Sequence, residues 1–214
     1  MFFRKSKSSG SQETLVDERA EPITMHFSNS SPTNTVVSRR SKPYMTISTT
    51  DSRTEVTHSP SKELLVLIKY KTFEAGTVQF SRFYQGKSLV MSEWLKKEKC
   101  KAWKRWVFET DVGYLAWRTD PQHPLVLCRA EDMHHPIIRV KERLPVYPAR
   151  SSETFLEMAI QQGHGLETIP EIILASYCIV EQLRAEKASL SKGLFKGGKD
   201  SQFLAAHAIG FGGM

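Results

Sequence analysis

Short apolar runs separated by Pro, Gly, Asn and Asp recur along most of the chain. Several runs alternate with period two, so that Val78 and Phe80 share one face of a predicted strand while Thr77 and Gln79 share the other. Such alternation, bounded by turn residues, is typical of half-buried strands. The pattern predicts eleven strands, at residues 23–28, 43–49, 54–58, 64–71, 76–83, 87–91, 104–109, 113–118, 124–130, 137–142 and 154–160.

One segment near the C-terminus follows a helical pattern instead. Thr168 is a suitable N-cap, Pro170 fits the first turn, and Glu171 completes a capping box. The apolar side chains that follow cover most of the helix circumference, yet the run is shorter than the roughly 20 residues needed to cross a bilayer. Such a helix belongs inside a protein. We therefore predict a mainly β fold, a closed antiparallel β-barrel or a strongly curved sheet, wrapped around one hydrophobic helix over residues 168–187.

The polar composition of both ends sets the predicted domain limits. Residues 1–22 are rich in Ser, Lys, Arg and Glu, which is typical of a disordered tail. Residues 188–214 contain several Gly and Lys residues and are predicted to form a flexible tail. A length of 214 residues fits one domain with tails, which we place at residues 23–187.

Charge and cysteine content indicate the compartment and the kind of partner. The formal net charge is +7 and the pI is about 9.3, which favours anionic partners. The three cysteines, Cys100, Cys128 and Cys178, are odd in number and widely spaced, as expected for reduced thiols. The first residues carry charge without the apolar core of a signal peptide. We expect a cytoplasmic monomer that is able to associate peripherally with membranes.

The most conspicuous polar feature is residues 94–106, where six cations and three tryptophans fall within thirteen positions. Lysine and arginine would attract phosphates, and tryptophan would sit at a lipid interface or stack on bases. Alternatively, the segment is a solvated connection whose tryptophans point into the core. The candidate anion- or lipid-binding residues are Trp94, Lys96, Lys97, Lys99, Lys101, Trp103, Lys104 and Arg105.

Catalytic motifs are missing from the sequence. No nucleophile elbow, Walker loop, HExxH motif or dinucleotide-binding glycine pattern occurs in its required context. The adjacent His134 and His135 would face opposite sides of a strand, so they do not suggest a metal site. Cys178 lies among apolar residues in the predicted helix, where thiols are normally inert. We predict no catalytic residue, no metal and no cofactor.

Three stretches, residues 25–37, 105–118 and 169–184, resemble a fungal family of unknown function within the Tubby C-terminal-like superfamily. That superfamily also contains LURP-one-related and scramblase-like proteins, and the resemblance covers roughly residues 23–187. It implies a β-barrel threaded by a hydrophobic helix, and it brings no activity or catalytic residue. The family pattern prefers an Asp-Gly turn before its Tyr-x-Trp strand, whereas Asp111-Val112-Gly113 is one residue longer here.

These observations predict a non-enzymatic interaction or scaffold domain of Tubby-like type. The alternative function is peripheral binding to anionic membrane lipids, phosphoinositides in particular, through residues 94–106. The resemblance favours lipid over nucleic acid as the anionic partner, because Tubby-like domains include phosphoinositide binders. Because a shared fold does not establish a shared function, a protein partner remains open as well.

Overall fold

The computed structural model describes residues 21–71, 75–99, 104–120, 123, 125–143 and 155–196 of the 214-residue chain. The predicted N-terminal tail lies outside the described residues except for residues 21 and 22, and the predicted C-terminal tail is described only as far as residue 196. The strands are β1 (Ile23–Phe27), β2 (Thr35–Arg39), β3 (Lys42–Thr49), β4 (Arg53–His58), β5 (Leu64–Lys69), β6 (Thr77–Phe80), β7 (Ser88–Val90), β8 (Lys96–Lys99), β9 (Lys104–Thr110), β10 (Gly113–Arg118), β11 (Val126–Arg129), β12 (Ile138–Arg143) and β13 (Phe155–Ile160). The helices are η1 (Tyr84–Gly86), α1 (Met91–Trp94), η2 (Leu166–Thr168) and α2 (Pro170–Lys196).

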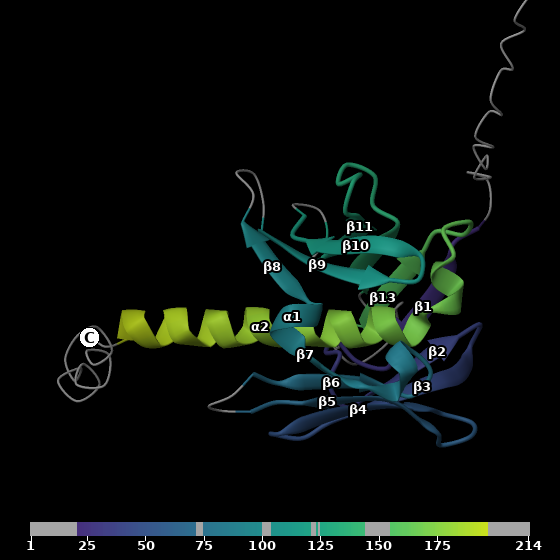
Figure 1. Cartoon of the computed structure of the whole chain (residues 1–214), viewed down its shortest axis with the longest axis horizontal. Coiled ribbons are helices and arrows are strands. Elements are labelled where there is room, and N and C mark those ends of the chain that lie inside the picture. Colours follow the sequence, from purple (N-terminus) through teal and green to yellow (C-terminus); the bar gives the residue numbers. More distant parts are fainter. Residues whose placement is uncertain are drawn as a thin grey trace, which may run out of the picture.

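All thirteen strands form one antiparallel sheet in the order β7-β6-β5-β4-β3-β2-β1-β13-β12-β11-β10-β9-β8. The sheet curves around α2, with β2 to β6 on one side of the helix and β8 to β11 on the other (Figure 1). Its two edge strands, β7 and β8, are not hydrogen-bonded to each other. Of the two predicted forms, the closed barrel is therefore wrong and the curved sheet is correct. The helical turn α1 connects these two edge strands along the chain.

Every predicted strand is present, and two further strands were not predicted. β8 has the sequence Lys-Lys-Glu-Lys and carries no apolar residue that could reveal a buried face. It is a strand because it pairs with β9, from Lys96 opposite Val107 to Lys99 opposite Lys104. β2 is short and follows a run of Asn, Ser and Pro. The local pattern in both places favoured a connection.

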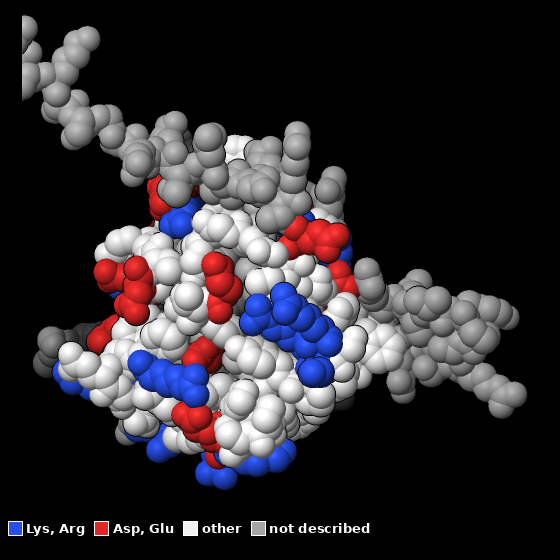
Figure 2. Space-filling model, turned by 90° about the vertical axis from the view of Figure 1, so that its right-hand side faces the viewer, with Lys and Arg blue, Asp and Glu red and all other residues white. Residues whose placement is uncertain are grey.

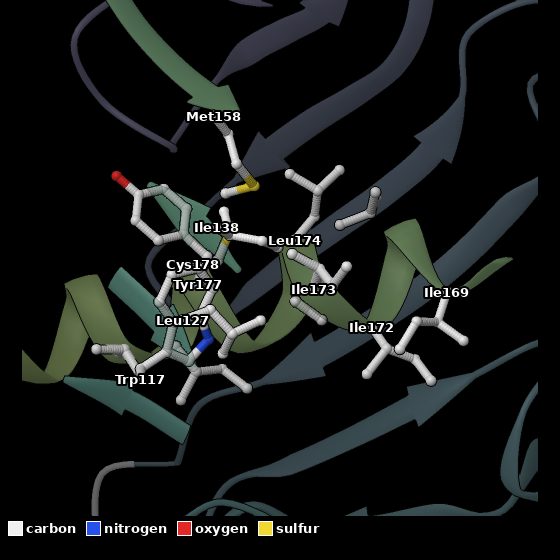
Figure 3. Packing of buried hydrophobic residues seen from close by; sticks show 14 of the residues in the cluster. Trp117, Leu127, Ile138, Met158, Ile169, Ile172, Ile173, Leu174, Tyr177 and Cys178 are labelled. Carbon is white, nitrogen blue, oxygen red and sulfur yellow. The ribbon is translucent and has the colours of Figure 1, made fainter. Parts of the chain in front are cut away.

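The hydrophobic helix lies inside the curved sheet, as predicted. Its first turns are buried on all sides, and they pack against Trp117, Leu127, Ile138 and Met158 of the surrounding strands (Figure 3). Burying each large side chain contributes about 1.5–3 kcal/mol to stability. The buried hydrophobic residues of this segment are Ile169, which directly precedes the helix, and Ile172, Ile173, Leu174, Ala175, Tyr177, Cys178, Ile179 and Val180 of α2.

The bounds of this helix differ from the prediction at both ends. Thr168, the predicted N-cap, is the last residue of η2, where its hydroxyl donates a 2.7 Å hydrogen bond to the carbonyl of Gly165. The helix begins at Pro170 and continues to Lys196, into the segment predicted as a tail. Its second half projects beyond the sheet (Figure 1), and Leu183 is already 42% exposed. Glycine and polar residues had suggested an earlier end, but they are tolerated in the part of the helix that leaves the core.

Candidate functional site

The basic segment predicted as an anion-binding surface forms the hairpin of β8 and β9. In its ladder, Lys97 pairs with Trp106 and Lys99 pairs with Lys104. Directly paired residues lie on the same face of a sheet, and Trp106 is only 5% exposed and belongs to the core around α2. The three lysine side chains therefore start from the hairpin face that is turned toward α2, and all three are exposed.

A fourth lysine reaches the same place from α2. Lys187 is exposed, and its side chain lies beside that of Lys104. That contact and the positive charge of Lys104 lower the pKa of Lys187, and the charges of Lys97 and Lys99 lower it further. None of the four lysines forms an ion pair with a carboxylate in the described part of the chain. We refer to Lys97, Lys99, Lys104 and Lys187 as the lysine cluster.

Two of the predicted cations lie on the other face of the hairpin. Lys96 and Arg105 alternate with the residues of the lysine cluster along β8 and β9, so their side chains point outward. Arg105 forms an ion pair with Glu98, with 2.6 Å between Nη2 and Oε2. Its charge is therefore already partnered. Lys101 and Trp103, the remaining predicted cation and tryptophan, lie outside the described residues.

The tryptophans of this segment that the structure describes are structural residues. Trp94 is 8% exposed, and its Nε1 donates a 3.1 Å hydrogen bond to the hydroxyl of Tyr84. Trp106 is also buried, and its Nε1 has no hydrogen-bond partner among the described atoms. Neither ring is placed to enter a lipid interface. For these two residues the prediction of core-directed tryptophans is confirmed, whereas the lysines stay at the surface.

Sequence reasoning missed Lys187. The sequence showed that this residue lies in the polar end of the helix. It did not show which residues surround it, because they depend on where α2 passes β8 and β9. The only available signal was the change of the helix from apolar to charged after Val180.

A groove of about 620 Å³ lies where the sheet fails to close. Among the described residues, β7 pairs only with β6. β8 pairs with β9 only along Lys104–Val107, so the following residues of β9, Phe108–Thr110, have no described strand on the β8 side. We call the space between these two free edges the seam groove. Its lining residues are Tyr84, Ser88, Leu89, Val90, Glu93, Trp94, Lys96, Val107, Phe108, Glu109, Thr110, Asp111 and Tyr114.

The two edges of the seam groove are held together by side chains. Tyr84 donates a 2.6 Å hydrogen bond to the backbone carbonyl of Glu109. The rings of Trp94 and Phe108 lie 5.4 Å apart and join α1 to β9. Burial raises the pKa of Tyr84, the Trp94 hydrogen bond opposes the rise, and the negative charges of Asp111 and Glu109 add to it. The groove therefore has an aromatic floor and carboxylates close above it.

A family model covers most of this architecture. Residues 30–186 match the Family of unknown function (DUF6593). The chain belongs to the DUF6593 family. No curated protein and no solved structure matches the chain significantly.

The matched range contains most of the candidate surfaces but not the whole DUF6593 domain. It includes the seam groove, β8 and β9, and ends one residue before Lys187. It begins after β1, although β1 pairs with both β2 and β13 and thereby joins the two halves of the sheet. The structural domain of this DUF6593 protein therefore starts earlier than the family match.

Other reactive groups of the DUF6593 domain are buried or scattered. Burial raises the pKa of Cys178 to about 12, so this thiol stays protonated, and burial also raises the pKa of Cys128. Cys100 lies outside the described residues. Within the described ranges, no three His, Cys, Asp or Glu side chains gather closely enough to hold a metal ion. No helix in the described part of the chain combines the length and hydrophobicity needed to span a membrane.

Proposed function

We propose that this DUF6593 protein is a non-enzymatic interaction domain of Tubby-like architecture that binds anionic membrane surfaces through the lysine cluster. The observation that carries the proposal is the convergence of Lys97, Lys99, Lys104 and Lys187 from β8, β9 and α2. The kinship with the fungal Tubby-like family and a cytoplasmic location are parts of the same proposal.

The filled interior favours binding at the outer surface. In a curved sheet, the inside is the natural place for a small ligand. Here that space holds α2, with Leu174 and Tyr177 at 0% and 1% exposure. A ligand must therefore bind on the outside or at an edge, which suits an interaction domain.

Electrostatics supports anion binding at the lysine cluster. The four positive charges lie close together, and none of them forms an ion pair with a carboxylate among the described residues. They repel one another, which is why the pKa of Lys187 is lowered. Lipid phosphates would relieve that repulsion, and basic residues near an anionic membrane surface are attracted to it. At the opposite end of the molecule, acidic and basic side chains are interspersed (Figure 2), so a membrane would be met preferentially by the end that carries the cluster.

The buried tryptophans define the kind of membrane contact we propose. With Trp94 and Trp106 in the core, the described part of the segment offers charge without an inserting ring. Binding of this kind is electrostatic, and salt screens it strongly because the charges are exposed.

Vesicle sedimentation tests the proposal. The full chain is mixed with phosphatidylcholine vesicles, with or without a phosphoinositide or phosphatidylserine. We expect sedimentation only with the anionic lipids, and loss of it in the K97A/K99A/K104A/K187A variant and at high salt. The matched control is K42A/K69A/K87A/K141A, which removes the same charge from four other exposed lysines.

The comparison of the two lysine variants decides the outcome. Equal binding by both would show that only net charge matters and would contradict a defined site. Absence of binding to any anionic vesicle would refute the membrane function and leave a protein partner as the remaining role for an interaction domain.

A further inference from the structure

The seam groove lies between two strand edges that face each other and have no partner strand there among the described residues. Met91 donates a backbone hydrogen bond to Gly76, across the β6–β7 ladder. In an antiparallel ladder, every second residue forms backbone hydrogen bonds to the neighbouring strand. Counting from Met91, Leu89 therefore bonds to β6, whereas the N–H and C=O of Ser88 point away from β6, toward the seam groove. On the facing strand, the carbonyl of Glu109 points into the same space, since it accepts the hydrogen bond from Tyr84.

Free edges of this kind are templates for an added strand. An extended peptide that pairs with a sheet edge gains main-chain hydrogen bonds, while pockets for alternate side chains supply specificity. The aromatic floor of the groove would receive the apolar side chains of such a peptide. Tyr84, Trp94 and Phe108 form this floor, and the rings of Trp94 and Phe108 lie 5.4 Å apart. The buried ring of Phe80 packs against Tyr84 and Trp94 at 5.3 and 5.2 Å between ring centroids.

The rim of the seam groove selects the charge of the peptide. Glu93, Glu109 and Asp111 line it, all three exposed, against a single cation, Lys96. In the described part of the chain, none of these carboxylates is engaged in an ion pair. Tyr114, also in the lining and 54% exposed, offers an aromatic face to a cationic side chain. The rim is thus acidic in a chain whose net charge is +7.

We propose that the seam groove binds an extended, Lys- or Arg-containing segment of a partner protein, which adds a strand at the open seam of the sheet. Its apolar side chains alternate toward the aromatic floor and its basic side chains toward Glu93, Glu109 and Asp111. This docking site is separate from the lysine cluster, since the outward Lys96 lies on the hairpin face opposite Lys97 and Lys99. The two surfaces would let one domain hold a membrane and a protein at once.

Fluorescence anisotropy with the full chain tests the proposal. The probe is a labelled peptide of about nine residues, enough for a strand of typical length, in which Lys and Arg alternate with Val and Thr. The matched peptide carries Glu in place of Lys and Arg. We expect binding of the basic peptide alone, weakened about tenfold in E93Q/E109Q/D111N because exposed ion pairs contribute modestly each. The control D51N/E131Q/E167Q, which neutralises three exposed carboxylates elsewhere, should bind like the unaltered chain.

A backbone variant separates strand addition from simple charge attraction. Ser88→Pro removes the N–H that faces the seam groove and leaves the hydrogen bonds toward β6, and Lys87 already has the extended conformation that precedes proline (φ −72°, ψ 147°). We expect weaker peptide binding with an unchanged far-UV circular dichroism spectrum. Equal affinity for the basic peptide in E93Q/E109Q/D111N and its control would overturn the proposal. So would a concentration-dependent dimer lost in Ser88→Pro, because the occupant would then be a second copy of the chain.

Discussion

The indole Nε1 of Trp117 donates a 2.8 Å hydrogen bond to the hydroxyl of Ser176, inside the molecule where both residues are 0% exposed. Ser176 in turn donates to the backbone carbonyl of Ile173, at 2.9 Å. A chain of two hydrogen bonds thus connects β10 to one turn of α2. Trp117 and Ile173 belong to the buried hydrophobic cluster around this link (Figure 3). Because a buried donor without a partner is costly, this link sets the rotation of the helix against the sheet.

Replacing Ser176 by alanine tests that link. The Ser176→Ala variant leaves the buried N–H of Trp117 unpaired, and we expect a loss of about 1–3 kcal/mol in the free energy of unfolding. Urea denaturation followed by tryptophan fluorescence measures it. Ser92→Ala, at an exposed position of α1, is the control and should change stability by less than about 0.5 kcal/mol. Equal stability of the two variants would mean that the link does not orient α2.

The position of α2 inside the sheet predicts a contrast between two leucines of the same helix. Leu174 is 0% exposed and Leu183 is 42% exposed. Truncating a buried leucine removes its burial and leaves a cavity, so Leu174→Ala should cost about 2–5 kcal/mol. Leu183→Ala, beyond the enclosed turns, should cost less than about 1 kcal/mol. Thermal denaturation of both variants measures the difference, and similar costs would show that α2 is not enclosed as described.

The enclosed helix was predictable because its signal is local. The apolar residues between Ile169 and Val180 occupy too many sides of a helix for a surface position, and the alternating strands needed no tertiary information. The open seam was not predictable, because closure depends on how the two ends of the sheet meet. Strand β8 was missed because only its partner β9 makes it a strand.

The candidate site shows the same limit. The basic segment was visible in the sequence, but the separation of Lys97 and Lys99 from Lys96 requires the knowledge that these residues form a strand. The contribution of Lys187 requires the path of α2 past that strand. The seam groove joins β7 and β9, whose facing edges no local pattern brings together. The grouping of residues from different elements is therefore visible only in the folded chain.

Burial of Cys178 predicts a loss of stability at alkaline pH. Burial raises the pKa of this thiol from an ordinary value near 9 to about 12 in the folded protein. The thiol is protonated in both states below pH 9, where the contribution to stability is fully present. Between pH 9 and 12, the unfolded chain ionises and the folded one does not, so stability falls by about 1 kcal/mol per pH unit.

Urea midpoints at pH 8 and pH 10 measure this loss. The matched variant is Cys178→Ala, which has no ionisable group at that position and should lose less stability over the same interval. Burial also raises the pKa of Tyr70 to about 12. Because both proteins contain Tyr70, its contribution to the alkaline loss of stability cancels in the comparison. An identical alkaline loss in the two proteins would assign the effect to other groups.

We expect that residues 30–186, the range matched by the family model, do not fold without strand β1. β1 pairs with β2 on one side and β13 on the other, and its Met25 and Phe27 are almost fully buried. The Phe27 ring also contacts Tyr177 of α2, at 6.0 Å between ring centroids. Truncating two buried side chains of this size lowers the free energy of unfolding by about 5–10 kcal/mol. This loss is comparable with the whole stability of a typical domain. A chain that begins at residue 30 should therefore give the circular dichroism and broad thermal profile of an unfolded protein, whereas one that begins at residue 21 should unfold cooperatively. Cooperative unfolding of the shorter chain would show that β2 and β13 are able to pair without β1.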